Sequence, residues 1–132
     1  MPATESARLL VADHARACHD ARVFVTNFVR RARWAGSAED AALVMDELVA
    51  NALTHTHSES VIECHVVDAV LHLEVHDRDP SNLRTISVPG VGGGYGLRVV
   101  AALSRTWGCE AERTGKKVWA ELRDDSVPLD QG

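Results

Sequence analysis

The sequence predicts an α+β domain, a two-layer α/β sandwich in which three helices cover one face of a mostly antiparallel sheet. Two observations carry this prediction. Residues 40–55 are apolar over most of a helical circumference, as expected of a helix packed inside a domain. Residues 61–77 instead alternate between apolar and polar side chains, which is typical of strands, and a tight turn near Asp68-Ala69 makes them an antiparallel hairpin.

The composition is that of one soluble domain. The chain has 132 residues, of which 45% are hydrophobic and 25% charged, so it is large enough to bury a core. A net charge of −5 argues against direct nucleic-acid binding. The 3 cysteines are widely spaced and form no disulfide framework, and no long apolar run is present. We therefore expect a cytoplasmic protein without membrane attachment.

The N-terminal part should form an edge strand and a first helix. Residues 7–12 suit a short strand, and apolar residues at helical spacing continue from about Asp13 or His19 through Val29. Gly36 is the expected stop of this helix. Ser37 then caps the next helix, with Asp40 three residues later as a looser form of the capping box.

The helix over residues 40–55 carries a polar row. Glu47, Asn51 and His55 recur every four residues and therefore share one face, beside Val44 and Leu48. Polar groups directed toward a core must find partners or line a pocket. Taken alone, Glu47 and Asn51 are more simply a polar pair that holds two helices together. The functional alternative is an Mg²⁺ ligand in Asn51 and a general base in Glu47.

The hairpin directs a second carboxylate toward the interior. In its second strand, the alternate apolar residues from Leu71 to Val75 should face the interior, whereas His72 and His76 face outward. Asp77 is the next residue in the inward-facing series and should therefore be buried. Asp77 is then either a strand-end carboxylate bonded to nearby backbone or a buried acceptor for an exocyclic amine such as that of adenine.

A glycine-rich turn precedes the third helix. Residues 78–93 lack periodicity and should form a loop, the helix begins around Gly94–Gly96, and strands follow at 107–111 and 118–122. Backbone N–H groups at a helix N-terminus favour polyphosphate, although a flexible loop ending in a cap has the same pattern. Neither a P-loop lysine nor the Rossmann glycine order is present. The candidate phosphate-binding residues are Gly92, Gly93, Gly94, Tyr95, Gly96 and Leu97.

The spacing of histidines and cysteines in the sequence indicates neither a zinc site nor a catalytic cysteine. His55 and His57 form an H-x-H pair, but no cysteine or aspartate spacing completes a structural zinc site. Cys64 has buried parity and no charged neighbour that would activate its thiol.

The order of these motifs resembles the GHKL ATP-binding (Bergerat) fold shared by DNA gyrase B, MutL and the histidine kinases. Within that group the chain looks most like the anti-sigma-factor serine/threonine protein kinases and their actinobacterial relatives. Glu47-Leu-Val-Ala-Asn51-Ala-Leu-Thr-His55 resembles the N box, Asp77-Arg-Asp-Pro80 the start of the G1 box, and Gly94-Tyr-Gly96-Leu97 the G2 box. The likeness covers residues 7–123, leaving 1–6 and 124–132 as flexible tails.

The resemblance implies a role for each motif. Glu47 would be the general base, Asn51 the ligand of the Mg²⁺ that accompanies ATP, and Asp77 the acceptor for the adenine amino group. The glycines would cradle phosphates beneath a lid formed by residues 81–93, and His55 would help to close the phosphate side.

Three departures from the family pattern bear on nucleotide affinity. Asp79 stands where the G1 box usually has glycine, and the loop from Asp77 to Gly94 is short, so the lid is small. A threonine common in the closing strand is replaced by Lys116 or Lys117, depending on the alignment.

The expected function is that of an anti-sigma-type serine/threonine kinase that uses ATP and Mg²⁺. It would phosphorylate an anti-anti-sigma (STAS) partner and regulate a sigma factor, with a homodimer possible from the family. A histidine kinase fits less well, because the stretch before the N box has room for one helix and no dimerisation hairpin. The alternative is an ATP-binding or nucleotide-free interaction module that regulates a partner by binding alone.

Overall fold

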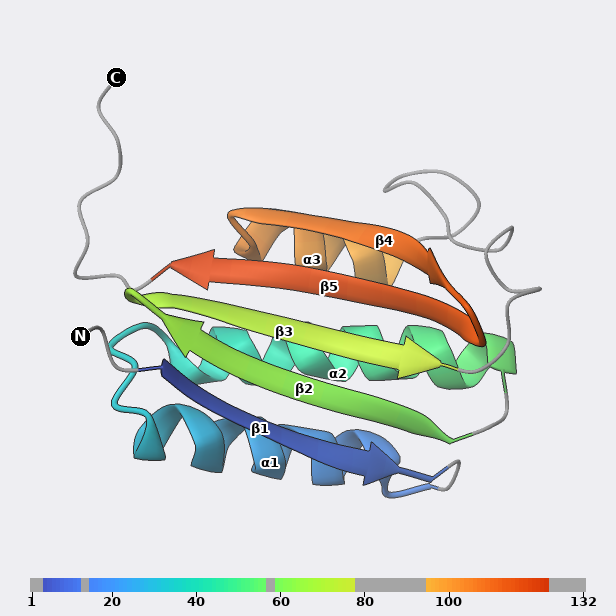
Figure 1. The fold of residues 1–132 in the computed structure, drawn as a ribbon, viewed down its shortest axis with the longest axis horizontal. Coiled ribbons are helices and arrows are strands. Elements are labelled where there is room, and N and C mark those ends of the chain that lie inside the picture. The colour runs from blue at the N-terminus through green and yellow to red at the C-terminus, as the bar shows by residue number, and fades with distance from the viewer. Residues whose placement is uncertain (1–3, 13–14, 57–58, 78–94, 124–132) are drawn as a thin grey trace.

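Three helices cover one face of a five-stranded antiparallel sheet (Figure 1). In this computed structural model the described residues are 4–12, 15–56, 59–77 and 95–123. The strands are β1 (Thr4–Val11), β2 (Ser60–Val67), β3 (Val70–Asp77), β4 (Thr106–Glu112) and β5 (Gly115–Arg123). The helices are α1 (Ala17–Arg31), α2 (Ala38–Thr56) and α3 (Tyr95–Leu103). The predicted sandwich is therefore confirmed.

The sheet has the strand order β1-β2-β3-β5-β4, and every neighbouring pair is antiparallel. Its register follows the alternation of the sequence. The inward residues of β2, β3 and β5 are almost fully buried under the helices: Ile62, Cys64, Val66, Leu71, Leu73, Val75, Val118, Ala120 and Leu122. Because side chains alternate between faces, the polar residues between them lie on the face that no described helix covers.

Helix α2 lies in the middle of the helical layer. It packs against α1 on one side, α3 on the other, and β3, β2 and β5 beneath it. Buried residues therefore cover most of its circumference: Ala41, Val44, Met45, Leu48, Val49 and Ala52. This position explains why its sequence is apolar on nearly every side. Within the described part of the chain, no helix is long and apolar enough to cross a membrane.

The connection between α1 and α2 corrects one prediction. The first helix ends at Arg31, before Gly36, and the chain turns at Arg33, which has a φ of 56°. Gly36 instead lies against the Trp34 ring, where an added Cβ would be 2.4 Å from a ring carbon. Trp34 Nε1 donates a hydrogen bond to the Ala69 carbonyl oxygen at 3.0 Å, which ties this connection to the β2–β3 turn.

The cap of α2 agrees with its prediction, whereas some strand boundaries differ from theirs by up to three residues. The Asp40 N–H donates to Ser37 Oγ at 3.0 Å, so the predicted cap of α2 is confirmed. Strand β1 starts at Thr4, ahead of the predicted residue 7. Strands β4 and β5 are longer than expected, and only residues 113 and 114 separate them. The predicted loop over residues 78–93 lies outside the described residues.

Candidate functional site

The elements that carry the predicted site residues meet at one end of the molecule. The C-terminal half of α2, the end of β3, the beginning of β5 and the start of α3 all lie there (Figure 1). Helix α2 packs directly on β3 and on α3. The topology therefore brings the N-box helix, the strand that ends in Asp77 and the helix that follows the glycine turn into one region.

Asn51 has a carbonyl oxygen that receives no hydrogen bond from the described residues. Its Oδ1 atom is buried, and no described residue donates to it. A buried amide oxygen without a partner costs about 1–3 kcal/mol, so such an atom usually has a ligand or a water in the working protein. An amide oxygen is also a ligand of the kind that Mg²⁺ takes. Asn51 therefore fits the Mg²⁺-binding position that the N box implies.

Glu47 lies one helical turn before Asn51 and is half-buried. Burial raises the pKa of the Glu47 carboxyl, and the neighbouring Asp46 carboxylate raises it further. A carboxylate with a raised pKa binds a proton more readily, which is the property that a general base requires. The position and the chemistry of Glu47 both suit proton transfer.

Asp77 forms a buried ion pair. It is 3% exposed at the end of β3, which confirms its predicted burial, and Lys116 Nζ lies 3.1 Å from its Oδ2 atom. Lys116 is itself 0% exposed. The register places Lys116 directly opposite Asp77, whereas Lys117 lies opposite His76 on the other face. Lys116 is thus the lysine that takes the inward position beside Asp77.

Sequence reasoning left the choice between Lys116 and Lys117 open. The alternation of the sequence favoured Lys116 in part. Val118, Ala120 and Leu122 face inward as every second residue of β5, and Lys116 is the preceding residue of that series. A carboxylate accepts about four hydrogen bonds. Pairing with Lys116 and acceptance from an exocyclic amine are therefore chemically compatible at Asp77.

The phosphate side of the predicted site is described only in part. Gly92, Gly93 and Gly94 lie outside the described residues, as does the side chain of His55. Tyr95 and Gly96 form the first residues of α3, and Leu97, which is 2% exposed, anchors that helix in the core. The predicted start of the third helix is therefore confirmed, whereas phosphate binding by the turn stays a prediction.

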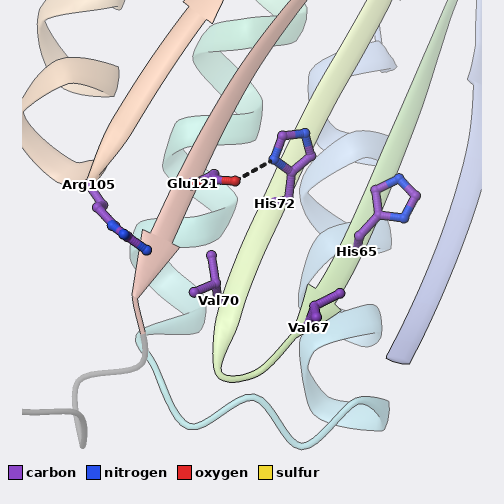
Figure 2. A pocket seen from close by; sticks show the side chains of 6 residues that line it. All are labelled: His65, Val67, Val70, His72, Arg105 and Glu121. Carbon is purple, nitrogen blue, oxygen red and sulfur yellow. Dashed lines mark hydrogen bonds and ion pairs between the residues drawn. The ribbon is translucent and has the colours of Figure 1, made fainter. Parts of the chain in front are cut away.

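A pocket on the face of the sheet opposite the helices contains none of the predicted site residues (Figure 2). Its volume is about 350 Å³, and it lies near the β2–β3 turn, away from Asp77. Its lining residues are His65, Val67, Val70, His72, Arg105 and Glu121. Thiol chemistry is not indicated at Cys64 either, because this residue is fully buried and burial raises the pKa of its thiol to about 12.

Comparisons with known proteins agree with this geometry. The crystal structure of the RsbU and RsbW domains of Rv1364c from Mycobacterium tuberculosis matches with a TM-score of 0.65 and 17% sequence identity, over 90% of this chain and 32% of that chain. The chain thus spans about a third of that protein, and the likeness concerns the fold. No curated protein matches the chain. The model of the histidine kinase-like ATPase domain matches residues 6–122, so the chain belongs to the family of histidine kinase-like ATPase domains, as the GHKL resemblance led us to expect.

Proposed function

We propose that the chain is an ATP- and Mg²⁺-dependent serine/threonine protein kinase of the anti-sigma type. It would phosphorylate an anti-anti-sigma (STAS) partner and sequester a sigma factor when that partner is absent. Asn51 carries this proposal, because its buried Oδ1 atom has no donor among the described residues and suits a hard metal ion. Membership of the ATPase family and the fold shared with an RsbW domain support it.

Each residue has a separate task in this proposal. Asn51 would hold Mg²⁺, which supplies positive charge next to the phosphates. Glu47 would accept the hydroxyl proton of the substrate serine while the serine oxygen bonds to the terminal phosphorus of ATP, whose bond to the bridging oxygen breaks so that ADP leaves. The raised pKa of Glu47 suits that task. Asp77 would bind the adenine amino group while paired with Lys116. The glycines 92–94 and 96 would contact phosphate, with Tyr95 and Leu97 supporting the turn and His55 beside it.

A regulator that acts by binding alone is the second candidate. The observation that favours it is the ion pair between Lys116 and Asp77, because the ammonium group lies against the carboxylate that adenine would need. Such a protein would bind the same kind of partner without transferring phosphate. In either form the family also leads us to propose a homodimer.

Isothermal titration of the purified chain with Mg·ATP tests the nucleotide site. We expect Asp77→Asn to weaken binding by about 10- to 100-fold, since a hydrogen bond to a charged group contributes about 1.5–3 kcal/mol. Circular dichroism of the variant verifies its fold. Absence of wild-type binding would favour the nucleotide-free regulator, and equal affinities for both proteins would contradict the adenine assignment.

Phosphate transfer from radiolabelled ATP to STAS-domain proteins of the source organism tests the kinase chemistry. Glu47→Gln should leave ATP affinity nearly unchanged but slow transfer by about 10²- to 10⁴-fold, the usual contribution of a general base. Glu39→Gln, an exposed position in the first turn of the same helix, is the matched control and should transfer normally. Undiminished transfer by Glu47→Gln would remove Glu47 as the base.

A further inference from the structure

The outer face of the sheet carries a cluster of titratable side chains that the proposed kinase site does not use. Strand pairing places Glu63 opposite Glu74 and His65 opposite His72 across β2 and β3. His76 lies two residues beyond Glu74 on the same face. We call Glu63, Glu74 and His76 the outer-face triad. Figure 2 shows His65 and His72, which lie next to this triad toward the β2–β3 turn.

Two carboxylates of the triad lie directly opposite each other and depend on nearby positive charge. Glu63 and Glu74 are directly opposed cross-strand neighbours, and like charges in that relation destabilise a sheet. Glu74 is only 8% exposed, so water screens its charge poorly. Lys117 Nζ and His72 Nε2 lie 3.4 and 3.2 Å from Glu74 Oε1, and Arg8 Nε lies 4.0 Å from Glu63 Oε1. Among the described side chains, His76 is the one whose ring nitrogen lies close to both carboxylates, so the space between the three groups suits a positive ion.

His76 brings a nitrogen ligand to the same point. Its Nε2 atom lies 2.7 Å from Glu63 Oε2 and 3.4 Å from Glu74 Oε2. One ligand atom from each of the three residues falls within 4.8 Å of the others. Tetrahedral zinc with bonds of about 2.1 Å separates its ligands by about 3.4 Å, so small side-chain movements suffice to place an ion at the centre.

A fourth residue holds the imidazole in the orientation that metal binding needs. Glu112 Oε1, from β4, lies 2.8 Å from His76 Nδ1. With the Nδ1 proton donated to this carboxylate, Nε2 is the nitrogen that faces Glu63 and Glu74, and a bound metal ion would take the place of its proton. Metal-binding histidines commonly have such a carboxylate on the second ring nitrogen, where it fixes the tautomer and increases the basicity of the ligand.

We propose that Glu63, Glu74 and His76 bind a divalent transition-metal ion, Zn²⁺ in the first instance, with water completing the coordination. A mixed set of imidazole and carboxylate ligands suits zinc, whereas Mg²⁺ and Ca²⁺ prefer oxygen ligands alone. The ion would link β2 to β3 directly and to β4 through Glu112. It would be separate from the Mg²⁺ proposed at Asn51, because the triad lies on the face of the sheet opposite the helices.

Titration of the full chain with ZnCl₂, after removal of metal by chelation and of any histidine tag, tests the proposal. We expect one Zn²⁺ per chain in calorimetry without nucleotide, and a tetrahedral absorption band when Co²⁺ replaces Zn²⁺. His76→Gln and Glu63→Gln should each abolish both signals. Glu112→Gln should weaken binding by about 10- to 100-fold, as loss of a hydrogen-bonded carboxylate behind a ligand does.

Two controls separate the triad from other histidines. His19→Gln, exposed on α1, should bind Zn²⁺ like the wild type. The double variant His55→Gln/His57→Gln tests the H-x-H pair of the sequence and should also bind normally. Loss of binding in that double variant, unchanged binding in a folded His76→Gln protein, or no binding by the wild type would each overturn the proposal. Circular dichroism verifies that every variant is folded.

Discussion

At the scale of single residues, the buried pair of Lys116 and Asp77 is the most consequential feature of the candidate site. Both side chains are almost fully buried, with 0% and 1% of their areas exposed, and their charged atoms are 3.1 Å apart. Removing both charges from water costs several kcal/mol per ion, which their mutual attraction offsets only in good geometry. Each residue therefore depends on the other.

A double-mutant cycle measures this dependence. Lys116→Met and Asp77→Asn should each lower the free energy of unfolding by about 3–5 kcal/mol, because each leaves a buried group that has lost its charged partner. The double variant should lose much less than the sum of the two. Urea unfolding followed by circular dichroism gives the four free energies.

The ion pair between Lys117 and Glu110 serves as the control cycle. Its nitrogen and oxygen lie 3.3 Å apart, but 60% of the Glu110 side chain is exposed, so we expect a coupling energy of at most about 1 kcal/mol. Additive losses at Lys116 and Asp77 would contradict the strong dependence of the buried pair.

The same pair marks the limit of residue-level prediction. The burial of Asp77 followed from alternation along one strand, and the structure confirms it. Whether Lys116 or Lys117 accompanies it depends on the register between β3 and β5, which a single strand does not determine. The proposed metal site was not predicted for a related reason: Glu74 and His76 lie on β3, but Glu63 and Glu112 come from two other strands, and the sequence alone does not show that they meet.

At the scale of elements, the β2–β3 hairpin has a two-residue turn with an unfavourable residue. Asp68 and Ala69 have φ values of 51° and 69°, so both occupy left-handed conformations. Turns of this kind suit the twist of a hairpin and prefer Asn-Gly or Asp-Gly. Aspartate tolerates the conformation, whereas the Cβ of alanine costs about 1–2 kcal/mol there.

Ala69→Gly should therefore stabilise the protein, by about 1 kcal/mol or less, because glycine relieves the Cβ strain but loses more chain entropy on folding. The hydrogen bond from Trp34 should persist, since its acceptor is the backbone oxygen of residue 69. Thermal and urea unfolding measure the change.

Ala101→Gly, in the last turn of α3, is the matched control. Its backbone is helical, so glycine should cost about 0.5–1 kcal/mol there. Destabilisation of similar size at Ala69 would show that the turn carries no strain.

Element boundaries were predictable where a local pattern determined them. Ser37 caps α2 as its sequence indicates. The end of α1 was misplaced because Gly36 has a second use, close packing against the Trp34 ring, while Arg33 takes the left-handed position that glycine usually fills. A glycine in the sequence does not distinguish these two requirements.

At the scale of the whole molecule, the fold class followed from the separate periodicities of helices and strands. The strand order did not, because nothing local indicates that β5 lies between β3 and β4. This order matters for the site. It places the start of β5, and therefore Lys116, beside the end of the strand that carries Asp77.

The same order predicts how stability is distributed. Strand β3 is central, has β2 and β5 on its two sides, and lies beneath α2. Strands β1 and β4 are the edges of the sheet, and every residue of β4 is exposed or half-buried. Local opening requires less free energy where fewer apolar contacts are lost, so the edges should open without the centre.

Hydrogen exchange of the metal-free, nucleotide-free protein measures this difference. We expect the slowest amides in β3 and in the residues of β2 and β5 that pair with it, at rates approaching those of global unfolding. Amides of β4 that bond to β5 should exchange at least about ten times faster, since an opening free energy lower by only about 1.4 kcal/mol has that effect. Equal protection of β3 and β4 would instead show that the sheet opens as one unit. The part of β3 and β5 that carries Asp77 and Lys116 would then open as readily as the edge strand β4.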